Sequence, residues 1–170
     1  MRIRFLVILL SCALASGGCL KNPPANDAET KQKIQQVLDR WEQAFEAKDL
    51  DGVMSIYAPG DALVAYDVVP PLQYKGADAY RKDYADFFAQ IDGPLKVEDG
   101  DEHIMVSGDL GLAYGLEHLT GKLKDGTPLD TWLRYSDGLR RINDRWLVVH
   151  EHVSVPADLA TGEARLDLKP

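Results

Sequence analysis

The chain has 170 residues and a formal net charge of −8, from 27 acidic and 19 basic side chains. Apolar residues make up 45% of it and charged residues 27%, which is typical of a single globular domain and excludes a disordered or fibrous chain. The acidic balance argues against a nucleic-acid partner, because negative side chains repel the phosphate backbone.

The amino terminus has the layout of a secretory signal over residues 1–18. Two arginines precede the apolar run at 5–10, and small residues follow it. The run is too short for a membrane span, which needs about 20 apolar residues. Two processing routes remain open. Cleavage after the Ala-Leu-Ala at 13–15 would release a soluble protein, whereas residues 14–19 resemble a bacterial lipobox in which Cys19 is lipidated.

Either route predicts an exported protein, periplasmic or anchored to a membrane by lipid. Residues 19–27 are then expected to form a tether, residues 28–156 the folded domain and residues 157–170 a C-terminal extension. Both cysteines precede the domain, so a disulfide, a thiol nucleophile and a thiolate metal site are excluded from it.

Three helices are predicted in the first part of the domain. Apolar side chains follow helical spacing over residues 34–45, 50–57 and 77–91. The second helix ends at Pro59-Gly60, and the third opens after Gly76. Between them, residues 62–67 are expected to form a short strand and residues 68–74 a loop.

The pattern changes to strands after residue 93. The candidate strands are residues 95–97, 103–107, 110–123, 129–142 and 146–155, with hairpin turns at Asp125-Gly126 and Asn143-Asp144. Helices followed by an antiparallel meander predict an α+β domain. The acidic run at 98–102 is interpreted as a solvated loop, because it lacks the ligand spacing of a calcium-binding loop.

Strand side chains alternate between two faces, which groups the candidate site residues. Strict alternation puts His150 and His152 on one face of the last strand, together with Trp146, Val148 and Ser154. In the strand before, Trp132 and Arg134 share a face with small residues, a mixture that favours a polar-lined pocket. His118 is placed similarly one strand earlier.

The motif His150-Glu151-His152 also suggests a metal site, with His118 or Asp67 as a third ligand. Two histidines are a weak metal signal. We therefore favour hydrogen-bonded pocket histidines and expect neither a metal nor a cofactor.

Several separated motifs resemble the SnoaL-like, nuclear transport factor 2-like superfamily. They are Ala47-Lys48-Asp49-Leu50-Asp51-Gly52, the helix start at Gly76, and Arg145-Trp146 leading into His150-Glu151-His152-Val153-Ser154. The segments YDVVPPLQYKGADAYRKDY (66–84) and WLVVHEHVSVP (146–156) look like a ketosteroid-isomerase-like bacterial subgroup.

This resemblance implies a cone-shaped fold of three N-terminal helices packed on a curved antiparallel β-sheet, with a cavity open at one end, and commonly a homodimer. Steroid isomerases of the superfamily use a carboxylate base with a tyrosine and a protonated acid as oxyanion donors. The resemblance implies Asp67 near the position of the base and Trp41 where the tyrosine donor would be.

Three functions remain open at this point. The first is proton-transfer chemistry (isomerase, cyclase or hydrolase type) on a small carbonyl compound or epoxide, with Asp67 as base, His150 as a second acid/base group and Arg134 holding an oxyanion. The second is non-catalytic binding of a small organic acid by Arg134. The third is a metal-dependent β-barrel, which the helical first third disfavours. The residues expected to line the pocket are Trp41, Tyr57, His118, Trp132 and His152.

Overall fold

The computed structural model describes residues 27–170. The predicted signal segment, the lipobox and Cys19 lie outside the described residues. Three α-helices form in the first part of the domain: α1 (Asp27–Glu46), α2 (Leu50–Met54) and α3 (Ala77–Phe88), with a short 3-10 helix η1 at Gly60–Ala62. None of the helices described here is long and apolar enough to cross a membrane.

Local chemistry explains where these helices begin. The Asp49 carboxylate accepts a hydrogen bond of 3.1 Å from the Gly52 backbone N–H, which caps the start of α2. Helix α3 begins after Gly76, whose φ of 87° lies in the region that favours glycine. Helix α1 buries Ile34, Val37 and other apolar residues at helical spacing, as the sequence predicts.

Six strands form one mixed sheet in the order β2-β1-β6-β5-β4-β3. Their bounds are β1 Val64–Tyr66, β2 Tyr74–Lys75, β3 Lys96–Ser107, β4 Leu110–Lys122, β5 Pro128–Ile142 and β6 Arg145–Ser154. The predicted α+β class is confirmed. The sheet is not purely antiparallel, because β1 runs parallel to β6 along the edge of the long meander.

Two local predictions are wrong. The segments at 95–97 and 103–107 belong to one strand, β3, because the acidic run between them pairs with β4 instead of forming a solvated loop. The segment at 68–74, predicted as a loop, ends in β2, where Tyr74 pairs with Ala65 of β1.

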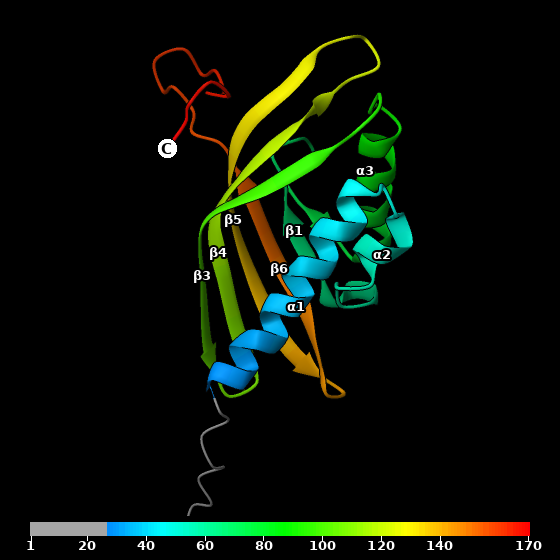
Figure 1. The fold of residues 1–170 in the computed structure, drawn as a ribbon, viewed down its shortest axis with the longest axis vertical. Coiled ribbons are helices and arrows are strands. Elements are labelled where there is room, and N and C mark those ends of the chain that lie inside the picture. The colour runs from blue at the N-terminus through cyan, green and yellow to red at the C-terminus, as the bar shows by residue number, and fades with distance from the viewer. Residues whose placement is uncertain (1–26) are drawn as a thin grey trace, which may run out of the picture.

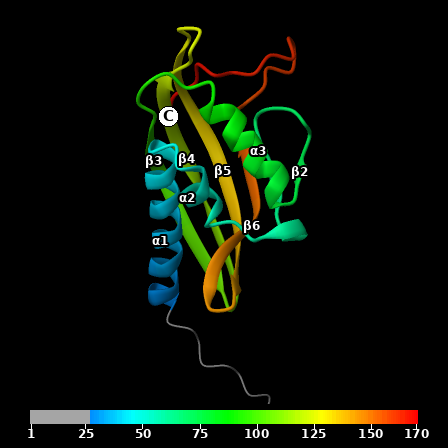
Figure 2. The same cartoon turned by 90° about the vertical axis from the view of Figure 1, so that its right-hand side faces the viewer.

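The helices cover one side of the curved sheet, which we call the inner face (Figure 1). Figure 2, with this face toward the viewer, shows α1 near the β3 edge of the sheet and α3 nearer the opposite edge. The core lies between α1 and the inner face, where Ile34, Leu139 and Trp146 are buried. Gly111 permits this close packing, since a Cβ atom there would lie 2.5 Å from Ile34 Cδ1.

The opposite side of the sheet, the outer face, carries no helix (Figure 1). The C-terminal segment 157–170 runs beside β5, where the Thr131 hydroxyl donates to the Leu166 carbonyl at 3.1 Å. The inner face is therefore covered by the helices, whereas the outer face has no helix over it.

Candidate functional site

A small cavity lies between α1 and the inner face of the sheet. Its volume, measured as space open to the centre of a water molecule, is about 30 Å³, enough for about two waters. Its walls come from α1, the segment after α2 and all four long strands. The lining residues are Leu38, Trp41, Glu42, Ile56, Tyr57, Asp99, Glu102, Glu117, Tyr135, Asp137, Glu151 and Val153.

Two β-bulges determine which side chains of β3 and β6 face this cavity. In β3 the register shifts between Gly100 and His103, so that Asp101 and Glu102 together oppose Gly115 of β4. Such an extra residue changes the side to which the following side chains point. Asp99 and Glu102 both line the cavity as a result.

The second bulge lies in β6. Gly138 of β5 pairs with His150, whereas the next residue, Leu139, pairs with Val148. Val149 is the extra residue. Val148 is buried in the core before the bulge and Glu151 lines the cavity after it, so the strict alternation predicted for this strand is wrong from Val149 onward.

Glu151 stands at the centre of a hydrogen-bond network. Its Oε1 accepts a bond of 2.7 Å from the Tyr80 hydroxyl, and its Oε2 accepts one from Tyr57. Burial raises the pKa of Glu151 to about 7, although the two tyrosine donors favour its ionised form and act in the opposite direction. This carboxyl group therefore changes its charge near neutral pH.

The network continues from Glu151 through two tyrosines to Trp41 on α1. The Tyr57 and Tyr84 hydroxyls lie 2.7 Å apart, and the Trp41 indole N–H donates to Tyr84 at 3.1 Å. Each group has one proton to donate, so the order Trp41 to Tyr84 to Tyr57 to Glu151 satisfies every contact. Burial raises the pKa of Tyr57 well above its ordinary value and keeps the phenol protonated.

Tyr80 connects Glu151 to Asp67. Its hydroxyl lies 3.0 Å from Asp67 Oδ2 and 2.7 Å from Glu151 Oε1. A phenol has a single proton, so the second contact needs a proton on one of the two carboxyl groups. The three groups therefore share a proton that can move between Glu151 and the partly exposed Asp67, whose pKa is raised by burial.

Two further carboxyl groups lie in the cavity wall on β4 and β5. Asp137 pairs directly with Glu151 across the strands, which places two carboxyl groups side by side, so that their like charges would repel if both ionised. Burial and the Glu151 charge raise the pKa of Asp137, and the same two causes raise the pKa of Glu117 to about 8. Glu117 is therefore mostly protonated at neutral pH, and burial favours the protonated form of Asp137 as well.

The rim of the cavity is acidic as well. The Tyr135 hydroxyl donates to Glu102 at 2.9 Å, and burial raises the pKa of the neighbouring Asp99. Gly115, opposite the bulge, has no side chain because a Cβ atom there would lie 3.1 Å from Glu102 Cα and from Tyr135 Cε1. This glycine lets the bulge and the tyrosine pack together.

The structure brings together three of the residues that the sequence singles out. Trp41 and Tyr57 line the cavity, and Asp67 reaches its network through Tyr80. The catalytic roles assigned to them remain predictions. The surroundings of Asp67 fit a relay group at least as well as a base, because Tyr80 lies between it and the cavity.

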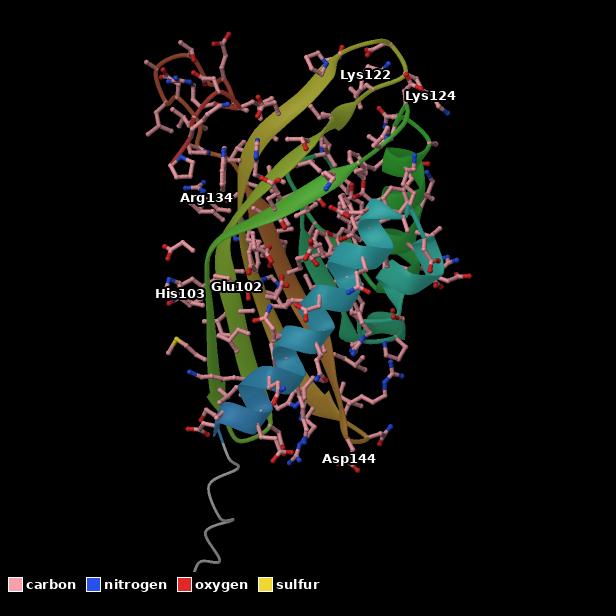
Figure 3. The ribbon with its side chains drawn as sticks, in the orientation of Figure 1. Glu102, His103, Lys122, Lys124, Arg134 and Asp144 are labelled. Carbon is pink, nitrogen blue, oxygen red and sulfur yellow. The ribbon has the colours of Figure 1, made fainter. Side chains whose placement is uncertain are left out.

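The other five candidates lie on the outer face, outside this cavity. The His118 ring stacks on Trp132 with centroids 4.8 Å apart, and His118 contacts Asp130 at 2.7 Å. Arg134 is exposed on the side of the sheet away from α1, as is His103 (Figure 3). Arg134 and Asp67 therefore do not share a pocket, contrary to the prediction from the sequence.

His150 and His152 also face outward, beside Tyr66 of β1. The His150 Nδ1–H donates to the Val64 carbonyl at 2.9 Å, and its ring contacts Tyr66 edge to face. Within residues 27–170, no three His, Cys, Asp or Glu side chains are grouped so that they could hold a metal ion.

The sequence analysis missed the buried acids Glu117, Asp137 and Glu151. One signal was available: each lies in a strand between apolar residues of the same face, as Glu117 does between Ala113 and Leu119. A charged residue in such a position is seldom buried without a functional reason.

Comparison with known proteins assigns the domain to one protein family. A model of the SnoaL-like domain matches residues 34–158. No curated protein sequence matches the chain.

Solved structures share its fold. A nuclear transport factor 2-like protein of unknown function from Pseudomonas putida KT2440 is 34% identical, with a TM-score of 0.76 over 84% of this chain and 98% of the other. A nuclear transport factor 2-like superfamily protein from Salmonella enterica serovar Typhimurium is 21% identical, with a TM-score of 0.70 over 81% and 99%. A ketosteroid isomerase-like protein from Erwinia carotovora is 18% identical, with a TM-score of 0.62 over 72% and 93%.

Proposed function

The chain belongs to the SnoaL-like family of the nuclear transport factor 2-like superfamily, and from this premise we propose that it is an enzyme that transfers a proton on a small carbonyl compound without a cofactor. Isomerase-, dehydratase- and cyclase-type enzymes are frequent in this family. The observation that carries the proposal is Glu151: a buried carboxyl group on the cavity wall, held by two tyrosines, with a pKa of about 7. General bases work best when their pKa is near the working pH.

In this proposal ionised Glu151 removes a proton from the carbon next to the substrate carbonyl. The electron pair of the C–H bond forms a carbon–carbon double bond and the π pair of the carbonyl moves to its oxygen, which gives an enolate. Protonated Glu117 or Asp137 donates a hydrogen bond to that oxygen, as neutral acids do in sites of this kind. Return of the proton to the same or another carbon completes exchange or isomerisation.

Tyr80 and Asp67 provide a path along which Glu151 exchanges its proton with solvent. The path follows the hydrogen bonds from Glu151 Oε1 through the Tyr80 hydroxyl to Asp67 Oδ2. Asp67 is thereby a relay in the proposal, and Glu151 takes the role of base that the sequence suggested for Asp67.

The test uses acetone, because the cavity admits only small groups. Exchange of its methyl protons in D₂O, followed by ¹H NMR, reports enolate formation directly. We expect exchange above the buffer rate with the unaltered protein, and a loss of about 100-fold or more with Glu151→Gln. Glu163→Gln, the same change at an exposed position, should leave the rate unchanged. Equal rates for the unaltered protein and Glu151→Gln would refute the proposal.

The alternative of a non-catalytic binder of a small organic acid depended on Arg134. That side chain lies on the outer face, and the cavity is lined by acids. Repulsion between these acids and a carboxylate disfavours this function, so the structure supplies no observation in favour of it.

We further propose that the protein forms a homodimer through its outer face. Met105, Leu110 and Leu112 are each at least 41% exposed there, on adjacent strands. An exposed group of large apolar residues is typical of an interaction surface.

Export also remains a proposal. Mass spectrometry of the protein recovered from a bacterial host distinguishes the two processing routes. A lipid mass on an amino-terminal Cys19 supports a lipoprotein, a chain that begins at Ser16 supports a soluble periplasmic protein, and an uncleaved chain contradicts both.

A further inference from the structure

The charged residues that line the cavity are all acidic. Six of its lining residues carry carboxyl groups, and among the described residues that line it none is lysine, arginine or histidine. The acids come from five different elements: Glu42 from α1, Asp99 and Glu102 from β3, Glu117 from β4, Asp137 from β5 and Glu151 from β6.

Asp137 adds an independent observation. Only 7% of this residue is exposed, and its Oδ1 atom is buried without a hydrogen-bond partner among the described residues. A buried polar atom left unpaired destabilises the fold, so such an atom in a natural protein calls for an explanation. Because Asp137 lines the cavity, a donor that enters the cavity would satisfy it.

We propose that the cavity binds the ammonium group of a small organic cation, with Asp137 and Glu151 as its principal acceptors. This inference goes beyond the proposed function, because an ammonium group held by Asp137 and Glu151 occupies the carboxyl groups that would act on a carbonyl substrate. An ammonium group has three N–H donors and no acceptor, which matches a wall of carboxyl oxygens.

The structure favours an organic cation over two other ligands. The described residues contain no group of three side chains placed to ligate a metal ion. An anion would meet six acids and no positive charge. A compact ammonium head group also suits the small cavity volume, while the rest of the ligand can extend toward the open rim.

Cation binding is expected to release protons. Burial raises the pKa of Glu117 to about 8 and that of Glu151 to about 7, and it raises the pKa of Asp137 as well. A positive charge beside these groups favours their ionised forms. Alkylammonium ions keep their own proton well above pH 8. The affinity should therefore rise between pH 6 and pH 8.

The test compares three probes of similar size: ethylammonium, ethanol and acetate. The chain has three tryptophans, so a ¹⁵N spectrum gives three indole signals, and the signal absent in Trp41→Phe is that of Trp41. Trp41 lines the cavity, whereas Trp132 on the outer face serves as an internal reference. Each probe is titrated into the full-length protein.

We expect ethylammonium to shift the Trp41 signal and to bind at least tenfold more tightly than ethanol, while acetate gives no shift. Asp137→Asn should weaken ethylammonium binding at least tenfold. Asp144→Asn, the same change in the distant β5–β6 turn (Figure 3), should not. If Asp137→Asn does not fold, Glu117→Gln is the second variant, with a smaller loss expected.

Equal affinity for ethanol, preference for acetate, absence of binding, or full affinity in the folded Asp137→Asn protein would each overturn the inference. Ethylammonium has no carbonyl, so its binding is independent of the proposed chemistry. Ethylammonium binding without acetone exchange would refute only the proposed function. Acetone exchange without ethylammonium binding would refute only this inference.

Discussion

Glu117→Gln replaces a buried carboxyl group by an amide of nearly the same size, and it should make the free energy of unfolding less dependent on pH. Burial raises the pKa of Glu117 from its ordinary 4.5 to about 8. Between these values the folded protein keeps a proton that the unfolded chain has released. Stability therefore falls as pH rises through this window, and the loss is complete only above about pH 8.

The slope follows from proton linkage. One protonated group of this kind lowers the free energy of unfolding by about 1.4 kcal/mol per pH unit, or about 3 kcal/mol between pH 5.5 and pH 7.5. The amide does not titrate, so the variant lacks this contribution. Glu151 and Asp137 remain in both proteins, so the difference reports the proton at position 117 together with any change that Glu117 causes in the pKa values of these neighbours.

Urea unfolding followed by tryptophan fluorescence, at pH 5.5 and pH 7.5, measures this difference. We expect the stability of Glu117→Gln relative to the unaltered protein to increase by about 3 kcal/mol from the lower to the higher pH. Glu163→Gln, at an exposed position, should show no such change. Parallel pH profiles for Glu117→Gln and the unaltered protein would refute the raised pKa and, with it, the burial argument for the cavity acids.

Three other predictions test separate parts of the structure. Tyr80→Phe removes a donor to Glu151, so the pKa of Glu151 should rise and the pH midpoint of acetone exchange should move up by about one unit; an unchanged midpoint would count against this contact. Gly111→Ala places a Cβ atom against Ile34 Cδ1 and should cost about 1–3 kcal/mol in thermal or urea unfolding. Adding Ile34→Val, which deletes that methyl group, should recover part of the loss, and no recovery would contradict the proposed clash. Leu112→Lys on the outer face should convert the proposed dimer to monomers in sedimentation velocity, and an intact dimer would place the interface elsewhere.

Much of the fold follows from the sequence. Helical spacing predicts α1 and α3, and the turn residues Asp125-Gly126 and Asn143-Asp144 fall between the strands that the structure pairs. These features depend on contacts close in sequence, which leave a periodic trace. The parallel pairing of β1 with β6 joins residues about 86 positions apart, as in Val64 and His150, and no local pattern predicts it.

The candidate site was predicted less well than the fold, because bulges in β3 and β6 change which side chains face the cavity. Trp41 lies on α1 and Tyr57 in the segment just after α2, and both line the cavity as expected. In β6 the run Trp146–Val149 is apolar on both faces, so alternation alone does not reveal a bulge there. In β3 the sequence did carry a sign of the bulge. Val97 and Ile104 are both apolar and share the inner face, although an odd number of positions separates them.

The two bulges have a consequence for aligning this chain with its relatives. Removing Asp101 from β3 and Val149 from β6 would restore regular ladders and leave every other side chain on its present face, because each is the extra residue in its pairing. In a relative whose strands are one residue shorter, the gap therefore belongs at these positions. An alignment that moves the β6 gap beyond Ser154 would instead match His150 of this chain to the position in the relative that corresponds to Glu151, and would assign a cavity residue to the outer face.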